Sequence, residues 1–264
     1  MRRLVGLGYR GELAHWLDGR PPEVGCLEIT AEHFMDRAQD QLRVLSRHYP
    51  LFVHGLGLSL GTRGPLEIDL LKRFARVVDA AAPLWISEHV AFTRTSEVDL
   101  GHLNPVRATR ESLQILSDHA REVADLCGKP LILENITSHV ALRGEMTEPD
   151  FLNRLCDQAE CGLLLDVTNL LVNSRNHHFD PLAWLDQIEP GHIVQLHVVG
   201  YSRDQGRWHD LHAEAIQEEL FDLTEEVLMR APVQAIIIER DENFPPPEEL
   251  AEELRRLEAA FVKA

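Results

Sequence analysis

Eight short apolar segments, separated by longer amphipathic ones, recur from one end of this chain to the other. They cover residues 4–7, 26–30, 51–54, 84–87, 131–133, 163–165, 193–197 and 235–238. Such runs are typical of buried parallel strands, and the amphipathic segments are typical of helices that cover them. A doubly wound sheet would usually carry a glycine-rich phosphate fingerprint after its first strand. The pattern therefore predicts an α/β fold, a single (β/α)8 TIM barrel over residues 1–264.

The segments between the strands predict seven helices and two long loops. The helices are expected over residues 36–48, 66–80, 105–127, 148–157, 181–186, 213–229 and 247–262. Asn104 before Pro105 and Asp180 before Pro181 are typical helix-start signals. The turn-rich stretches 93–103 and 201–209 are expected to be loops that follow strands, and no linker between domains is visible.

Charge and composition exclude several classes of partner. The chain has 26 basic and 43 acidic residues, a formal net charge of −17, which would repel nucleic acid and an anionic membrane surface. No apolar stretch is long enough for a signal peptide or a transmembrane helix, so we expect a cytoplasmic protein. The four cysteines show no CxxC spacing, and we expect them to be structural thiols in a reducing compartment.

Histidine and acidic side chains stand where the predicted strands end. Because the carboxyl ends of barrel strands meet at one face, these side chains should lie close together. Burying several carboxylates costs several kcal/mol each unless positive charge compensates, and no lysine stands at these strand ends. Bound divalent cations would supply the missing charge. Histidine with carboxylate and without cysteine suits iron, manganese or zinc.

The number of such residues predicts more than one ion. Eight of them are candidate metal ligands: His54, His89, Glu134, Asp166, His197, Asp210, His212 and Glu239. One ion uses about three or four protein ligands, so two or three ions that share a carboxylate are the economical interpretation. Glu134 stands on the middle strand and is the expected bridge. We expect Glu134, His54 and Asp166 at the catalytic centre, with Asp210 and His212 on one ion.

Other catalytic motifs find little support. The glycine-rich stretch 54–61 follows a strand, but its spacing matches neither the dinucleotide fingerprint nor the Walker A loop. No Gly-x-Ser-x-Gly motif is present, and no cysteine stands at a strand end beside a histidine. The sequence therefore favours metal chemistry over a serine or cysteine nucleophile.

A set of motifs along the whole chain resembles a known family, the DUF692 proteins or multinuclear non-haem iron-dependent oxidative enzymes. The motifs are Gly6-Leu7-Gly8-Tyr9-Arg10, Glu28 with Glu32, residues 54–61, Ser87-Glu88-His89, Leu133-Glu134-Asn135, residues 164–169, His197 and Ile238-Glu239-Arg240-Asp241. The set is specific in order and spacing. The chain departs from the common motifs at Glu32-His33 and at residues 197–201, which leaves the substrate open.

The resemblance implies a xylose-isomerase-like TIM barrel with two or three irons, mixed ferrous and ferric when active. Dioxygen would be used to modify a cysteine or aspartate of a ribosomally made precursor peptide, in natural-product biosynthesis. A separate partner protein would bind the leader of that peptide. The eight ligands carry over, and the resemblance implies that Asn169 and Asn135 serve as further ligands or as hydrogen-bond donors to ligands. We count Asn169 among the ligands.

Four charged residues near the strand ends are candidate substrate contacts: Arg10, Glu28, Glu32 and Arg240. For Arg10 and Arg240 the alternative is a salt bridge that closes the barrel. Two other functions stay open. One is a divalent-metal isomerase or hydrolase of the same barrel superfamily, although the charge disfavours a nuclease and the missing strand-end lysine disfavours a sugar isomerase. The other is a non-catalytic metal-dependent peptide-binding protein, in which loss of ligands would be expected.

Overall fold

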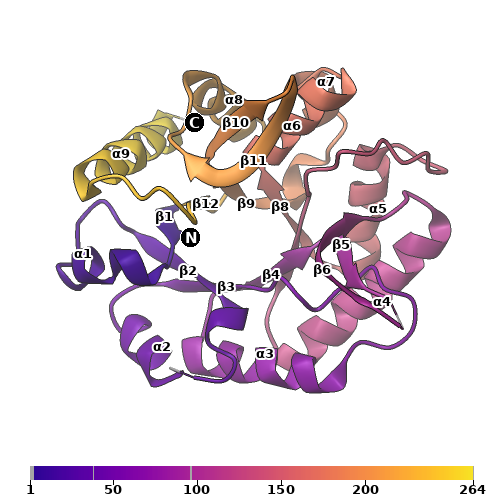
Figure 1. Ribbon diagram of the computed structural model, residues 1–264, viewed down its shortest axis with the longest axis horizontal. Helices are drawn as coiled ribbons and strands as arrows, with labels where there is room; N and C mark the ends of the chain where they lie inside the picture. Colours follow the sequence, from indigo (N-terminus) through magenta and orange to yellow (C-terminus); the bar gives the residue numbers. More distant parts are fainter. Residues whose placement is uncertain (1–2, 38, 96, 264) are drawn as a thin grey trace.

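Eight parallel strands close into a barrel in the computed structural model, which describes residues 3–37, 39–95 and 97–263 (Figure 1). They are β1 (Leu4–Gly8), β2 (Cys26–Thr30), β3 (Leu51–His54), β4 (Ile86–His89), β7 (Leu131–Glu134), β8 (Gly162–Asp166), β9 (Ile193–Val198) and β12 (Ala235–Ile238). The barrel closes where β1 pairs in parallel with β12, Leu4 opposite Ala235. The predicted fold and all eight predicted strands are confirmed.

Helices surround the barrel (Figure 1). The longer ones are α2 (Gln39–Leu45), α3 (Ile68–Ala81), α4 (Arg110–Cys127), α5 (Glu148–Ala159), α6 (Val167–His177), α8 (Glu218–Arg230) and α9 (Pro247–Lys263), with short α1 (Ala14–Asp18) and α7 (Pro181–Leu185) between them. Asp180 begins α7 as predicted, because its side chain accepts the Leu182 N–H. Among the helices described, none is both long and apolar enough to cross a membrane.

The inside of the barrel has an apolar half and a polar half. Side chains alternate between the two faces of a strand, so Phe52 and His54 both point inward from β3, and Leu164 and Asp166 both point inward from β8. The apolar members form a separate core cluster, in which the rings of Phe52 and Trp85 stack 4.3 Å apart. This cluster fills the amino end of the barrel. The polar members are therefore left at the carboxyl end.

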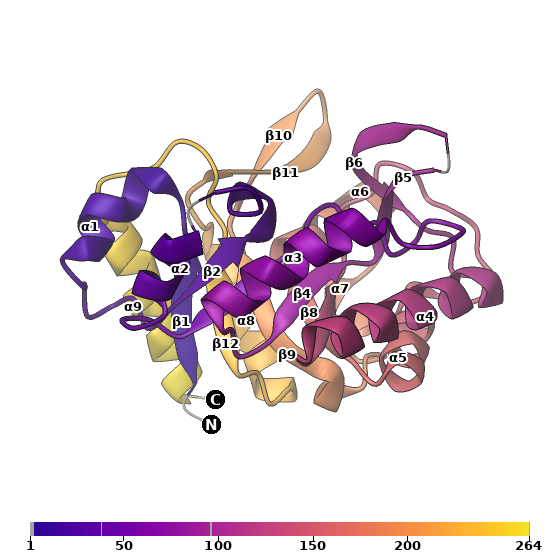
Figure 2. The ribbon, with the colours of Figure 1, turned by 90° about the horizontal axis from the view of Figure 1, so that it is seen from below.

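Two antiparallel hairpins take the place of the predicted long loops. They are β5 (Ala91–Arg94) with β6 (Asp99–Pro105), and β10 (Gly200–Asp204) with β11 (Arg207–Glu214). Figure 2 shows both hairpins projecting from the same side of the barrel. The stretches 93–103 and 201–209 thus follow strands as predicted, but the sequence did not indicate that each of them pairs as a hairpin.

The hairpins also displace two predicted helix starts. The Asn104 amide donates to the carbonyls of Phe92 and His102 inside the first hairpin and does not cap a helix. Helix α4 instead begins at Arg110, after Thr109 accepts the Ser112 N–H. The helix expected over 213–229 begins only at Glu218, because the chain is still in β11 at residue 214.

Candidate metal centre

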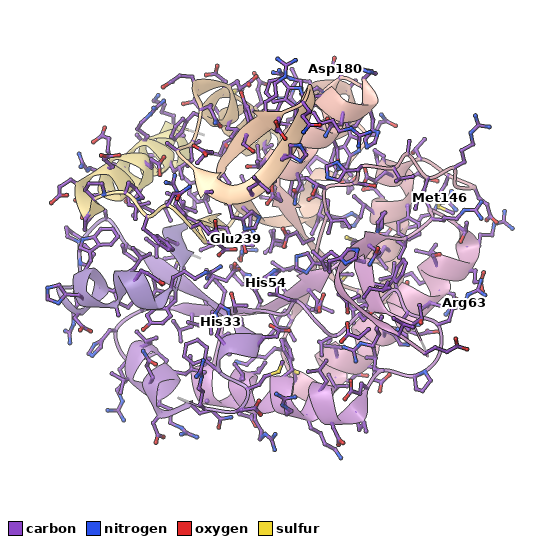
Figure 3. All side chains as sticks on the ribbon, in the orientation of Figure 1. His33, His54, Arg63, Met146, Asp180 and Glu239 are labelled. Carbon is purple, nitrogen blue, oxygen red and sulfur yellow. The ribbon has the colours of Figure 1, made fainter. Side chains whose placement is uncertain are left out.

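The eight predicted ligands gather into three groups at the carboxyl end of the barrel. The groups are His54, His89 and Glu134; Glu134, Asp166, His197 and Glu239; and Asp166, Asp210 and His212. Within each group, one ligand atom from every residue lies within 4.8 Å of the others. Figure 3 labels His54 and Glu239 near the middle of the barrel. The grouping shows that Asp166, like Glu134, belongs to two groups, a sharing that the sequence did not reveal.

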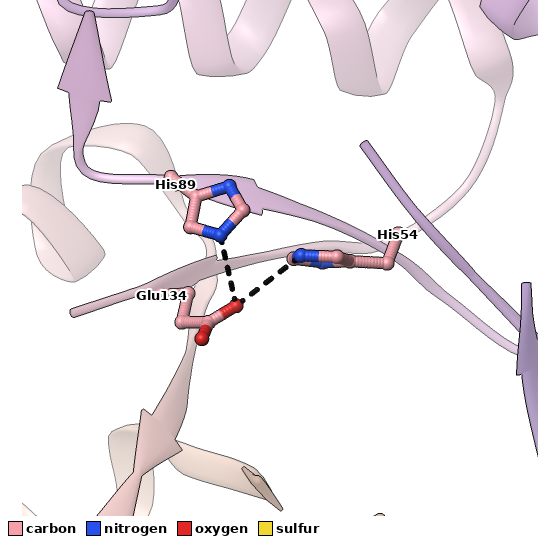
Figure 4. Close-up of side chains that lie close together, drawn as sticks. All are labelled: His54, His89 and Glu134. Atoms are coloured by element: carbon pink, nitrogen blue, oxygen red, sulfur yellow. Dashed lines mark ion pairs between the residues drawn. The ribbon is translucent and has the colours of Figure 1, made fainter. Parts of the chain in front are cut away.

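The first group consists of two histidines that face one carboxylate oxygen (Figure 4). The Nε2 atoms of His54 and His89 both lie 3.4 Å from Glu134 Oε2. The Ser87 hydroxyl lies 2.8 Å from Nδ1, the other ring nitrogen of His54, and holds the ring in this orientation. His54 Nε2 and Glu134 Oε2 are buried and lack a hydrogen-bond partner. Buried polar atoms normally have one, so these two atoms fit a bound cation.

The second group uses the other oxygen of the same carboxylate. His197 Nδ1 lies 3.4 Å from Glu134 Oε1 and 2.8 Å from Glu239 Oε2. Its other nitrogen, Nε2, lies 2.6 Å from Glu28 Oε1. Because Glu134 presents one oxygen to each of two groups, its geometry fits a bridge between two ions.

The third group combines a barrel residue with two residues of β11. His212 Nε2 lies 3.2 Å from Asp210 Oδ2. The Oδ2 atoms of Asp210 and Asp166 are buried without a hydrogen-bond partner, while Asp166 Oδ1 accepts the Asn169 N–H at the start of α6. The donor set of the three groups is nitrogen and oxygen only, which suits first-row divalent metals. The residues present therefore fit a multi-metal site.

The residues of the three ligand groups shift one another's pKa values. Burial, with the nearby Asp210 and Glu134 carboxylates, raises the pKa of Asp166 well above its usual value. Burial and the neighbouring His89 lower the pKa of His54. Burial would also lower the pKa of His89, but the carboxylates of Glu134 and Glu88 outweigh it and raise that pKa to about 9. The metal-free centre thus holds protons that a bound cation would replace.

Metal uptake should release protons at about pH 7 to 8, because His89 is protonated there and a metal ligand must be neutral. Apparent metal affinity should rise with pH up to about 9. The same shift stabilises the metal-free fold below pH 6.5, and that contribution is lost as the pH rises through about 9. Calorimetric titration with Mn²⁺ in buffers of different ionisation enthalpy measures the release. Identical heats in all buffers would contradict it.

Asn169 and Asn135 form a linked pair behind the ligands. Asn135 exchanges two hydrogen bonds with the backbone of Asp166, of 2.8 and 3.1 Å. The Asn169 amide donates to the Asn135 carbonyl at 3.1 Å, and Asn169 also borders the cavity above the ligands. These contacts hold the ends of β7 and β8 together.

The four candidate substrate contacts have different surroundings. Glu28 is buried beneath His197 and also accepts the Gln195 amide at 2.6 Å. Glu32 accepts the N–H groups of Leu56 and Gly57, both at 2.9 Å. Arg240 is buried and donates to the carbonyls of Glu214 and Asn243. Of the four, Arg10 alone borders the cavity, and it pairs there with Asp241.

A cavity of about 930 Å³ opens above the centre. Its floor carries the ligands Glu134, Asp210, His212 and Glu239. Its other wall comes from the residues that follow β1, the segment after β2 and the start of α2: Tyr9, Arg10, His33, Phe34, Arg37 and Gln41. Of these, only Arg10 was predicted from the sequence as a substrate contact. Figure 3 shows His33 beside the barrel mouth. The space is large enough for several residues of a peptide.

Comparison with known proteins covers the chain almost end to end. A sequence model of the family described as "RiPP precursor modification enzyme MbnB/TglH/ChrH" matches residues 4–261. A UPF0276 protein of Rhizorhabdus wittichii is 34% identical over 259 residues, 96% of this chain and 93% of the relative. One from Chromobacterium violaceum is 34% identical, over 97% of this chain and 94% of its own.

Solved structures with the same fold are more distant in sequence. An L-ribulose 3-epimerase superposes with a TM-score of 0.66 at 13% identity, over 100% of this chain and 97% of its own. Endonuclease IV from Thermus thermophilus superposes with a TM-score of 0.62 at 17% identity, over 99% of this chain and 100% of its own. At such identity the likeness concerns the barrel, here of the xylose-isomerase-like type, and not the reaction.

Proposed function

Because this chain belongs to the MbnB/TglH/ChrH family of RiPP precursor modification enzymes, we propose that it is an iron-dependent oxidative enzyme that acts on a ribosomally made precursor peptide. The residue modified would be a cysteine or an aspartate, and dioxygen the oxidant. The observation that carries the proposal is the chain of three ligand groups joined through Glu134 and Asp166. A metal isomerase or a simple peptide-binding barrel needs no such chain of shared carboxylates.

The proposed ligands of the ions are the eight predicted ones: His54, His89, Glu134, Asp166, His197, Asp210, His212 and Glu239. Two or three irons, in mixed ferrous and ferric states, would supply the redox chemistry and polarise the bound substrate. Asn169 faces the cavity beside them and is proposed as a further ligand or donor. The residues of the chain provide geometry, charge and a site shielded from water.

A buried chain of hydrogen bonds orients His197. The Trp85 indole donates to Gln195 at 2.7 Å, and Gln195 donates to Glu28 at 2.6 Å. Glu28 in turn lies 2.6 Å from His197 Nε2, so the imidazole proton is held on that nitrogen and Nδ1 is turned toward Glu134 and Glu239. Carboxylates behind metal-binding histidines commonly play this part. We therefore assign Glu28 to orienting His197 and not to substrate contact.

Two other charged residues do not border the cavity, and we propose that they support the site and do not bind substrate. Glu32 fixes the backbone of residues 56 and 57 beside His54, and Arg240 ties the end of β12 to the end of β11. We still propose Arg10 as a substrate contact, since it borders the cavity and its guanidinium, which pairs with Asp241, has further N–H donors for a carboxylate of the peptide. We further propose a separate leader-binding partner and a cytoplasmic location.

The test of this function is metal content together with oxygen dependence. Protein made in iron-supplemented cells should contain two or three irons per chain by elemental analysis, with ferrous and ferric signals in the Mössbauer spectrum. A precursor peptide encoded beside the gene should change mass only when iron and dioxygen are both present. A preparation with one zinc and no iron that is active without oxygen would contradict the proposal.

A further inference from the structure

The third ligand group depends on a hairpin that stands outside the barrel wall. Six proposed ligands lie in barrel strands or directly after one, whereas Asp210 and His212 lie on β11 of the hairpin β10–β11. Rigid strands hold ligands more accurately than a projecting hairpin does. Whatever fixes this hairpin therefore decides whether the third group is assembled.

Two side-chain amides form hydrogen bonds with the backbone at the two outer edges of the hairpin. On the β11 edge, Asn176 of α6 accepts the Trp208 N–H at 3.1 Å and donates to the Trp208 carbonyl at 2.9 Å. On the β10 edge, Gln217 accepts the Tyr201 N–H at 3.1 Å and donates to the Tyr201 carbonyl at 2.8 Å. Each amide thus replaces the neighbouring strand that an edge lacks. We call this pair the amide clamps.

The clamps hold residues immediately beside the ligands. Tyr201 is the cross-strand partner of Asp210, and Trp208 precedes Asp210 by two residues on the same strand. A displacement of either edge is therefore passed directly to the Asp210 backbone. At the barrel end of the same helix, Asp166 is the N-cap and its side chain accepts the Asn169 N–H, so α6 is also attached to the other side of the third group.

Aromatic and charged side chains complete the attachment. The Arg175 guanidinium lies 4.8 Å from the centre of the Trp208 ring, and the Tyr201 and Trp208 rings meet edge to face at 4.9 Å. Glu219 pairs with Arg175 and accepts the Tyr201 hydroxyl. These contacts hold side chains of the hairpin, whereas the two amides hold its backbone, with two hydrogen bonds each.

We propose that Asn176 and Gln217 are positioning residues that determine whether an ion is held by Asp166, Asp210 and His212. The inference rests on the proposed multinuclear function. Without the clamps the hairpin loses its backbone attachment to α6 and Gln217, and only the end of β11 stays tied to the segment after β12, through the His212 and Glu214 carbonyls. Asp210 then leaves the geometry of a shared ion, and Asp166 remains with its other group. The ions at the first and second groups should be unaffected, because their ligands are held by the barrel.

The test compares iron uptake by the wild-type chain and by the double variant Asn176→Leu, Gln217→Leu, which replaces both amides with apolar side chains of similar size. The probe is ferrous iron alone, added without oxygen and followed by elemental analysis after desalting. The variant should retain one iron fewer per chain than the wild type. The double variant Asp210→Ala, His212→Ala should lose the same equivalent, which identifies the ion.

A matched control is available on the far side of the fold. Asn153 makes the same kind of two-bond clamp, donating to the Gln187 carbonyl at 2.8 Å and accepting the Glu189 N–H at 2.9 Å, but no proposed ligand lies there. Asn153→Leu should lower stability and keep the full iron count. If the double leucine variant does not fold, Asn176→Asp, which replaces the donor to the Trp208 carbonyl with a negatively charged acceptor, should show the same loss at a lower iron concentration.

The outcomes separate this inference from the proposed function. Equal iron counts in the wild type and the clamp variants, with more than one ion in the wild type, would overturn the positioning role alone. A wild-type chain that binds a single ion would overturn both. Hydrogen exchange gives an independent readout: residues 200–214 should exchange faster in the clamp variants, and added iron should slow their exchange only in the wild type and in Asn153→Leu.

Discussion

Glu134→Ala is expected to remove more than one metal equivalent per chain and to abolish oxidation of the precursor peptide. The reason is that Oε2 faces His54 and His89 while Oε1 faces His197, so one substitution takes a ligand from two groups. It also leaves the buried His89 without the carboxylate that most strongly favours its charged form. Elemental analysis and a peptide mass assay under oxygen measure the two effects.

The control for this variant is a carboxylate of similar type away from the centre. Glu226 on α8 pairs with Arg230 one turn along the same helix, and Glu226→Ala should cost little stability and no metal. Loss of only one equivalent from Glu134→Ala would show that Glu134 serves one ion, and the bridging role would have to be abandoned.

Gly6→Ala is expected to destabilise the barrel by about 3 kcal/mol or more. A Cβ at this position on β1 would lie 2.0 Å from the Cys26 carbonyl oxygen of the neighbouring strand. That atom belongs to the backbone of a buried parallel pair and cannot turn aside. Urea unfolding of the metal-free chain measures the change in the free energy of unfolding.

Gly11→Ala is the matched control, because a Cβ there meets nothing within 4 Å. Its unfolding midpoint should stay within the error of the wild type. Should Gly6→Ala unfold at the same urea concentration as Gly11→Ala, the close approach of β1 and β2 would not be a determinant of barrel closure.

The barrel could be predicted from the sequence because each of its strands is a short apolar run. Helix α6 was missed since it follows β8 without a break: Asp166 both ends the strand and caps the helix, and the apolar residues 170–172 give no sign of a turn. The hairpin β10–β11 was missed for another reason. Its residues are mostly polar, and it is held by Asn176 and Gln217, whose contribution depends on contacts distant in sequence.

The candidate site was predictable in its residue types and not in its arrangement. A histidine or carboxylate at a strand end points to the same rim in any barrel, which is why His54, Glu134 and Asp166 could be placed together in advance. The position of Glu28 depends on strand alternation, which turns it inward beneath His197. The second shared carboxylate, Asp166, depends on the course of the hairpin that brings Asp210 to it.

The pairing of the first strand with the last has a consequence for the order of events during synthesis. β1 pairs with β2 on one side, but its partner on the other side, β12, exists only when residues 235–238 have been made, and Glu239 is the next residue along. Until then the growing chain can form only an open sheet with unpaired edges, and its histidines and carboxylates are not gathered at one site. Barrels of this kind gain their long-range contacts late. The full ligand set is therefore complete only once the barrel has closed, and opening of the β1–β12 pair would remove Glu239 from the second group.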